Sequence, residues 1–244
     1  MNEWPEVAIL IITYRRKELA IREIESIKQF LDYPNLTWHI ADDGSGYDYI
    51  DALCQAIGPD GGEIRFSDSS RAGVGANMNL GMDNVLRRTD LWLHMEDDWV
   101  LRQPLDLKPC VQALIENETI GMIRLGRLTA GIEAETISMA DRMWWRMKKG
   151  SDTYVFTGNA ALRHRRFFAA YGLYKEGATP GVTENEMCAA FNKKPGPDIV
   201  WPAWLGVEEM FFHIGDSQSF KYYMENEGMT AEEAANKWEG VVAE

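Results

Sequence analysis

The sequence predicts an α/β fold in which helices flank a mostly parallel central sheet, in a single domain whose C-terminal half is more irregular. Three observations support this prediction. Strand-like apolar runs alternate with helix-like amphipathic segments over about the first 95 residues, the pattern of an open parallel sheet. Polar clusters follow the first, second and fourth of these runs. The 244 residues, 45% of them hydrophobic, suffice for one large domain with its own core.

The first strand and helix have the clearest local signals. Residues 7–12 form an uninterrupted apolar run in which four of six side chains are β-branched. Such a run is typical of a strand that is buried on both faces of a parallel sheet. Residues 17–31 carry apolar side chains close to a 3.6-residue period, which predicts an amphipathic helix. The same signals predict strands at 36–41, 63–67 and 91–95, and helices at 49–57 and 73–88.

The regular alternation weakens after residue 100. Here the patterns predict strands at 120–128 and 154–157, and helices at 109–116, 166–171, 184–191 and 230–244. The last helix has Thr230 as its expected N-cap and Glu233 at the capping-box position.

Composition and charge exclude several classes of protein. No apolar run approaches the roughly 18 residues that a bilayer span needs, and the acidic N-terminus does not resemble a signal peptide. Three cysteines are too few for a disulfide framework, so we expect a cytoplasmic protein without a membrane span. The formal net charge of -13 disfavours non-specific binding to nucleic acid, because that binding depends on cationic neutralisation of phosphates.

An acidic cluster stands at the end of the fourth strand, where Glu96, Asp97 and Asp98 follow one another. Adjacent carboxylates repel one another unless a cation or hydrogen-bond donors compensate. Oxygen ligands of this kind suit Mg²⁺ or Mn²⁺ held by few protein groups and by substrate phosphates. Asp42-Asp43-Gly44-Ser45 closes the second strand. Because ligands of open α/β sheets bind at the carboxyl ends of the strands, we expect this turn to form a second acidic wall of the same crevice.

These residues resemble the nucleotide-sugar-dependent glycosyltransferases of the GT-A fold, most closely glycosyltransferase family 2. Four elements carry the resemblance, in the family's order, over about the first 100 residues. They are the first strand with Thr13-Tyr14-Arg15, the turn Asp42-Asp43-Gly44-Ser45, the Gly/Ala/Asn-rich residues 71–81, and Glu96-Asp97-Asp98-Trp99. The resemblance implies a GT-A domain in which residues 1–100 bind the nucleotide sugar and residues 101–244 hold the acceptor and the catalytic groups.

The resemblance also implies roles for individual residues. It assigns the nucleotide pocket to Thr13, Tyr14, Arg15, Asp42, Asp43 and Arg71. Asp43, or in its place Asp42, would hold the uracil or ribose, and Arg71 would lie near the base or the diphosphate. Asp97 would lie by the sugar and the ribose, and Asp98 would coordinate the divalent metal, Mn²⁺ or Mg²⁺.

Two later segments extend the resemblance. Thr183-Glu184-Asn185-Glu186-Met187 is similar to a family segment that carries the general base, and Glu184 falls at the base position. The family more often has Asp there, preceded by an acid, so Glu186 remains a rival. Phe212-His213-Ile214-Gly215 resembles a late His-x-Gly segment, in which His213 would bind the metal or the diphosphate.

The implied reaction moves a hexose from a UDP-sugar to a hydroxyl of a glycan or another soluble acceptor, with inversion at the anomeric carbon. The metal would stabilise the leaving diphosphate, and a carboxylate would take the acceptor's proton.

Residues 142–166 hold seven Lys or Arg and one Asp, together with Trp144 and Trp145. Basic residues interleaved with aromatics also suit a nucleic-acid strand, so hydroxymethylated bases in DNA are an alternative acceptor.

Two rival functions remain open at this point. A nucleotidyltransferase also uses a nucleotide, a metal and an α/β sheet, but its Gly-rich, Lys-containing phosphate loop is not found at Thr13-Tyr14-Arg15-Arg16. A nucleotide- or carbohydrate-binding module without catalysis is the second rival, because the base segment departs from the family pattern at Thr183 and Glu184.

Overall fold

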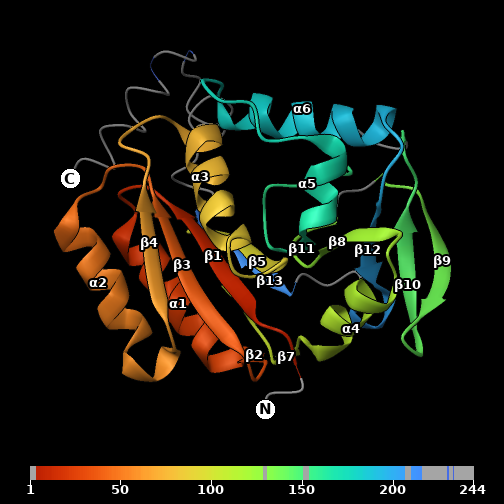
Figure 1. Ribbon diagram of the computed structural model, residues 1–244, viewed down its shortest axis with the longest axis horizontal. Coiled ribbons are helices and arrows are strands. Elements are labelled where there is room, and N and C mark those ends of the chain that lie inside the picture. The colour runs from red at the N-terminus through yellow and green to blue at the C-terminus, as the bar shows by residue number, and fades with distance from the viewer. Residues whose placement is uncertain are drawn as a thin grey trace.

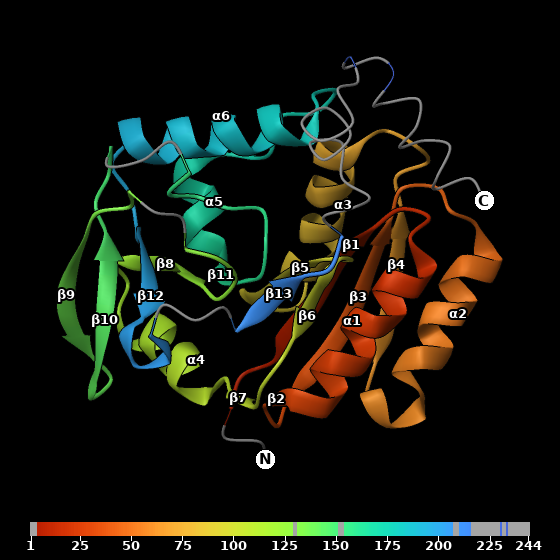
Figure 2. The ribbon, with the colours of Figure 1, turned by 180° about the vertical axis from the view of Figure 1, so that it is seen from behind.

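The computed structural model describes residues 4–128, 131–150, 154–206 and 210–215, together with Thr230 and Glu233. Its central feature is a nine-stranded sheet that runs from β4 at one edge to β9 at the other (Figure 1). Helices cover both faces of this sheet, as the opposite views in Figures 1 and 2 show. The predicted α/β fold is confirmed.

The N-terminal half is the predicted parallel sheet, with strands in the order β4-β3-β1-β5. The crossover helices lie between these strands in the sequence. The strands are β1 (Val7–Thr13), β3 (Leu36–Asp42), β4 (Ile64–Asp68) and β5 (Leu91–Glu96), and the helices are α1 (Lys17–Phe30), α2 (Tyr47–Ile57) and α3 (Val74–Leu86). Each predicted element of this half is therefore present, with bounds within a few residues of the sequence pattern.

The C-terminal half extends the same sheet in the order β11-β8-β12-β10-β9. Strand β11 is antiparallel to both β5 and β8, and β10 is antiparallel to both β12 and β9. Only β12 and β8 pair in parallel here, so the sheet as a whole is mixed, and the parallel arrangement holds for its first half. These strands are β8 (Ile120–Arg124), β9 (Ala134–Met139), β10 (Arg142–Met147), β11 (Ala161–His164) and β12 (Asp198–Pro202).

The remaining described elements are two small sheets and the other helices. Two small sheets pair β6 with β13 and β2 with β7. Their strands are β2 (Leu31–Asp32), β6 (Trp99–Leu101), β7 (Leu105–Asp106) and β13 (Phe211–His213). The other helices are α4 (Lys108–Glu116), α5 (Arg165–Tyr171), α6 (Pro180–Lys193) and the short 3-10 turns η1 (Pro59–Gly61) and η2 (Ala203–Leu205).

The sheet separates two hydrophobic cores. Ile9 and Ile11 of β1 face the core beneath α1, α2 and α4, whereas Leu10 and Ile12 face the core beneath α3, α5 and α6. The alternation arises because successive side chains of a strand point to opposite faces. Helices α3, α5 and α6 lie together along the top of Figure 1. The continuous apolar run of β1 is thus explained by burial on both faces.

Residues 154–157 were predicted as a strand, and this prediction is wrong. The segment is a series of turns, and the strand begins only at Ala161. The buried guanidinium of Arg124 donates to the carbonyl oxygens of Tyr154 and Val155, each at 2.8 Å. A side chain therefore satisfies backbone groups that a sheet ladder would otherwise bind.

The end of the chain lies mostly outside the described residues. Thr230 and Glu233 form the reciprocal bonds of a capping box, with Thr230 N donating to Glu233 Oε2 at 2.8 Å and Glu233 N donating to Thr230 Oγ1 at 3.3 Å. The rest of the predicted helix at 230–244 is outside the described part. Among the helices that the structure describes, none is long and apolar enough to cross a bilayer.

Candidate functional site

The polar ends of β1, β3 and β5 meet at one edge of the sheet. In the strand register Thr13 pairs with Asp42, and Ile12 pairs with Glu96. The backbone N–H of Asp97 then donates to the carbonyl of Ile12 at 3.1 Å. The sheet therefore brings three of the four family-like motifs to its carboxyl edge, where open α/β sheets bind their ligands.

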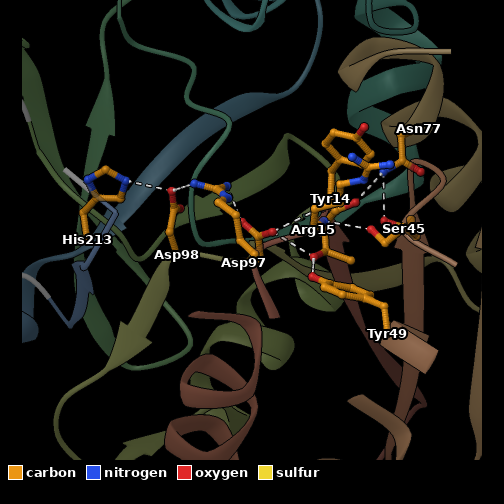
Figure 3. Close-up of polar contacts among 11 residues, drawn as sticks. Tyr14, Arg15, Ser45, Tyr49, Asn77, Asp97, Asp98 and His213 are labelled. Atoms are coloured by element: carbon orange, nitrogen blue, oxygen red, sulfur yellow. Dashed lines mark hydrogen bonds and ion pairs between the residues drawn. The ribbon is translucent and has the colours of Figure 1, made fainter. Parts of the chain in front are cut away.

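Asp97 is fully buried and is held by the first strand. Thr13 Oγ1 donates to Asp97 Oδ2 at 2.8 Å, and Tyr14 N donates to the same oxygen at 3.3 Å. The hydroxyl of Tyr49 on α2 contacts Thr13 Oγ1 in turn. Figure 3 shows this chain of contacts from Tyr49 toward Asp97. Thr13 is itself buried, so its hydroxyl orients Asp97 and does not line an open pocket.

Arg16 bridges the two aspartates. Its Nη2 contacts Asp97 Oδ1, and its Nη1 lies 2.5 Å from Asp98 Oδ2. Burial raises the pKa of Asp97, although Arg16 acts against this effect. Burial also disfavours the charged form of Asp98, but Arg16 and His213 outweigh it and hold the pKa of that carboxyl below its usual value.

His213 reaches Asp98 through strand pairing. Strands β13 and β6 are antiparallel, and their register places His213 opposite Trp99, the residue after Asp98. His213 Nε2 lies 3.1 Å from Asp98 Oδ2, as the dashed line in Figure 3 shows. A Cβ at Gly215 would lie 2.5 Å from the same oxygen, so the backbone approaches Asp98 so closely that only glycine fits. The structure thus places His213 beside Asp98, the residue expected to bind the metal.

The donor set at Asp98 fits a divalent cation bound with few protein ligands. Asp98 Oδ1 is buried and has no hydrogen-bond partner among the described residues, which leaves a carboxylate oxygen available as a ligand. His213 Nε2 supplies a second donor beside it. Within the described part of the chain, no group of three or more His, Cys, Asp or Glu side chains forms a metal cage. Such a site would need oxygen ligands from a substrate phosphate, the usual arrangement for Mg²⁺.

The turn after β3 separates the roles of its two aspartates. Asp42 is buried and accepts hydrogen bonds from Gly44 N at 3.1 Å and Ser45 N at 2.6 Å, so it stabilises its own turn. Asp43 is only half-buried, and its carboxylate accepts from Ser69 Oγ at 2.5 Å and from Gly73 N at 3.1 Å. Of the two, Asp43 has the partly open position that a nucleoside contact requires.

The other predicted nucleotide residues lie around this turn. Arg71 N donates to Asp43 O at 3.2 Å, and the Arg71 side chain is exposed. Arg15 N donates to Ser45 Oγ at 2.8 Å, and the Arg15 guanidinium lies 5.2 Å from the centre of the Tyr14 ring. The turn after β3 thus has four of the predicted nucleotide residues around it: Tyr14, Arg15, Asp43 and Arg71.

A cavity of about 220 Å³ opens beside the acidic cluster. It is lined by side chains from both halves of the chain, among them Glu96, Trp99, Tyr174, Glu184 and His213. Burial and the charges of Asp98 and Glu184 raise the pKa of Glu96 to about 8.

The two candidate bases differ in position. Glu184 lines the cavity, and its Oε1 accepts a hydrogen bond of 2.6 Å from Gly158 N. Glu186 is exposed and lies 3.4 Å from the ammonium of Lys175. Both belong to α6, where residues two apart lie on opposite faces. The structure therefore brings Glu184, and not Glu186, to the cavity.

Two residues of this site had no assigned role in the sequence prediction. Arg16 was noted only as part of the loop after the first strand, and Glu96 only as part of the acidic cluster. The signal for Arg16 was available: a buried pair of carboxylates requires a compensating cation, and the strand before it ends at the same sheet edge. Whether Arg15 or Arg16 contacts the aspartates depends on the direction of each side chain, which the sequence pattern does not specify.

Within the described residues, several basic side chains of the segment 142–166 are buried or paired. Arg163 is fully buried, and Arg166 donates to three backbone carbonyls. Arg146 pairs with Glu135, and Arg165 pairs with Asp90 at 2.6 Å. Trp144 is also fully buried and belongs to the core. At least four of the seven basic side chains in this pattern thus have structural partners.

Comparisons with known proteins agree with this geometry. A family model described as "Glycosyl transferase family 2" matches residues 8–171. The fold is similar to that of the mannosyltransferase PcManGT from Pyrobaculum calidifontis in complex with GDP-Man and Mn²⁺, with 15% identity and a TM-score of 0.54, covering 83% of this chain and 58% of that one. No curated protein matches the chain in sequence.

Two further structures share the fold. S. aureus TarS 1-349 in complex with UDP-GlcNAc has 10% identity and a TM-score of 0.59, covering 81% of this chain and 58% of that one. GalNAc-T7 with UDP, GalNAc and Mn²⁺ has 14% identity and a TM-score of 0.58, covering 92% of this chain and 48% of that one. The chain thus spans about half to three fifths of the length of these neighbours.

Proposed function

The chain belongs to glycosyl transferase family 2, and from this premise we propose that it transfers a hexose from a UDP-sugar to a hydroxyl of a glycan or another soluble acceptor. The main support is the placement of Glu184. Glu184 of α6 lines the same cavity as Glu96 at the end of β5 and as His213, which contacts Asp98, although these residues are far apart in the sequence. A nucleotide-sugar donor is supported by the similar structures, which hold GDP-Man with Mn²⁺, UDP-GlcNAc, or UDP and GalNAc with Mn²⁺.

The donor would bind along the carboxyl edge of the sheet. Asp43 would accept hydrogen bonds from the base or ribose, and Arg71 and Arg15 would supply positive charge near the diphosphate. Thr13 and Tyr14 would act through Asp97, whose carboxylate they hold beside the sugar and ribose. Asp98 and His213 would hold Mn²⁺ or Mg²⁺, which when bound would supply Lewis-acid stabilisation to the diphosphate.

Glu184 would act as the general base. Its Oε1 is fixed by Gly158 N, so the carboxylate faces the cavity in one orientation. It would take the proton from the acceptor hydroxyl while that oxygen forms a bond to the anomeric carbon. The bond from that carbon to the diphosphate oxygen breaks on the opposite side, and the electron pair leaves with the diphosphate. Attack opposite to the leaving group inverts the anomeric centre.

Substitution of the two rival bases tests the proposal. Glu184→Gln is expected to lower sugar transfer by about 10²–10⁴-fold, because general-base catalysis contributes about that much. The matched control, Glu186→Gln, is expected to keep near wild-type transfer, because Glu186 is exposed and pairs with Lys175. The measurement is release of UDP from UDP-sugars in the presence of Mn²⁺, with a panel of glycans and hydroxymethylated DNA as acceptors.

Asp98→Ala separates catalysis from simple binding. We expect it to lower turnover at least about tenfold, because it removes the proposed metal ligand. Equal turnover in wild type and Asp98→Ala would contradict the metal role. UDP-sugar binding without turnover by the wild-type protein on any acceptor would instead indicate a binding module. Transfer to hydroxymethylated DNA alone would favour the alternative acceptor, although several basic side chains of residues 142–166 are buried or paired.

A further inference from the structure

Arg16 contacts both buried aspartates of the proposed donor site. We propose that Arg16 is a displaceable counter-ion: it neutralises Asp97 and Asp98 when no donor is bound, and it moves to the diphosphate when the metal and the nucleotide bind together. This inference rests on the proposed function, since it concerns the order in which that site is filled.

The first step of the argument is the burial of the aspartates. The side chains of Asp97 and Asp98 are 0% and 7% exposed. Two neighbouring carboxylates in such surroundings are strongly destabilised unless a positive group lies between them. Arg16 supplies this group by contacting one oxygen of each aspartate.

The second step is that Arg16 and the proposed metal share the carboxylate of Asp98. Asp98 Oδ2 lies 2.5 Å from Arg16 Nη1 and 3.1 Å from His213 Nε2, and Oδ1 of the same carboxylate is the oxygen available to a metal. A divalent cation held by Asp98 and His213 would lie within a few ångströms of the guanidinium. Like charges this close repel strongly in a partly buried site. Arg16 and the metal are therefore expected to compete for Asp98.

The third step is that Arg16 is able to move. Arg16 is the N-cap residue of α1, and it makes no side-chain capping bond there. Among the described residues, its guanidinium has hydrogen bonds only to Asp97 and Asp98. Its side chain is 16% exposed, so it borders the open edge of the site. A diphosphate offers the same kind of paired anionic oxygens that a guanidinium binds with two hydrogen bonds.

A binding order follows from these steps. In the empty site Arg16 weakens binding of the metal alone, because the metal must separate it from Asp98. A nucleoside diphosphate gives Arg16 new partners and adds oxygen ligands for the metal, so each ligand strengthens binding of the other. The coupling would limit metal binding at the aspartates in the absence of the donor.

The test uses direct binding on the full chain, with no turnover. Mn²⁺ binding is measured by electron paramagnetic resonance of the free ion, without and with UDP, and UDP binding is measured by calorimetry in EDTA. The proteins are wild type, Arg16→Gln and Lys17→Gln. Lys17 is exposed and adjacent, so Lys17→Gln removes the same charge without removing a contact to Asp97 or Asp98. GDP serves as a second nucleotide probe.

Arg16→Gln is expected to bind Mn²⁺ alone about tenfold more tightly than wild type and to bind UDP in EDTA about tenfold more weakly, a coupling of ordinary size. Lys17→Gln should match wild type in both measurements. Arg16→Lys keeps the positive charge but cannot bond both aspartates through one planar guanidinium. It should therefore give affinities between those of wild type and Arg16→Gln.

Opposite changes in the two affinities distinguish this role from a structural one. If Arg16→Gln weakened both ligands, Arg16 would only maintain the shape of the site, and the inference would be overturned. Unchanged Mn²⁺ affinity in Arg16→Gln would overturn it as well. If wild type bound neither UDP nor GDP with Mn²⁺ present, the proposed function itself would fail, and this result differs from each of the others.

Discussion

Gly158 shows how tightly individual residues define the cavity. A Cβ at this position would lie 2.8 Å from Glu96 Oε1 and 3.8 Å from Glu184 Oε1. The first distance is closer than carbon and oxygen normally approach, so an added methyl group must displace the Glu96 carboxylate. The absence of a side chain at residue 158 thus lets two acidic side chains face the same space.

Gly158→Ala is therefore expected to lower sugar transfer at least about tenfold, because a displaced Glu96 would disturb the cavity beside Glu184, the proposed base, and small misplacements near reacting groups have effects of that size. Gly181→Ala is the matched control: Gly181 also lines the cavity, but a Cβ there would meet nothing within 4 Å. The measurement is the rate of UDP release by the two variants at equal folded fraction. Equal rates would show that Glu96 can move aside without consequence.

At the scale of elements, helix α3 connects the two halves of the domain. Asn79 on α3 donates to Tyr174 O at 3.0 Å and accepts from Tyr174 N at 3.0 Å, and its Nδ2 also donates to Glu176 Oε1 at 2.8 Å. Tyr174 lines the cavity, so these bonds set the distance between α3 and the cavity wall. Gly75 permits the close contact, because a Cβ there would lie 2.2 Å from Lys175 O.

Asn79→Ala is expected to lower the free energy of unfolding by about 1–3 kcal/mol, since it leaves buried backbone groups of Tyr174 without partners. Asn84→Ala on the same helix should cost less, because Asn84 Nδ2 donates to Leu80 O within α3. Chemical denaturation of both variants gives the comparison. A larger loss in Asn84→Ala would contradict the connecting role of Asn79.

The elements also show where sequence patterns are informative. The strands and helices of the first half were predicted because each has a local period and a local boundary. Strands β9, β10 and β12 were not predicted. The hairpin of β9 and β10 carries side chains of mixed polarity, and β12 pairs with β8 and β10, which lie far from it in the chain. Trp144 illustrates this limit: its place among basic residues suggested a contact with the acceptor, and the side chain is fully buried.

At the scale of the whole molecule, buried histidines contribute to the response of stability to acid. His39 is 3% exposed, and its Nε2 lies 3.0 Å from Ser67 Oγ. Burial, and to a lesser degree the charge of Arg65, lowers the pKa of His39 to about 4. His94 is also buried, and burial lowers its pKa in the same direction. The folded state therefore favours the neutral form of both side chains.

The sign of the pH effect follows from this difference. In the unfolded chain His39 takes up a proton below about pH 6.5, whereas in the folded chain it does so only near pH 4. The contribution of neutral His39 to stability is therefore fully present above about pH 6.5 and is lost as the pH falls toward about 4. At pH 5 the loss from His39 is about 2 kcal/mol. His39→Gln should therefore show a smaller drop in unfolding free energy between pH 8 and pH 5 than wild type. Equal drops in the two proteins would contradict the assignment.

The sequence by itself determined the α/β fold of the first half and placed Asp43, Asp97 and Asp98 at one sheet edge. It could do so because helical and strand periods are local properties and parallel strands end at a common edge.

Only the tertiary structure decided which nearby candidates meet. The sequence leaves Glu184 and Glu186 as rival bases, but the packing of α6 turns Glu184 toward the cavity and Glu186 toward Lys175. His213 reaches Asp98 because β13 pairs with β6, a contact between segments far apart in the chain. Arg16 bridges the aspartates because of the direction of one side chain at the start of α1. Each of these outcomes depends on long-range packing, which no short window of residues contains.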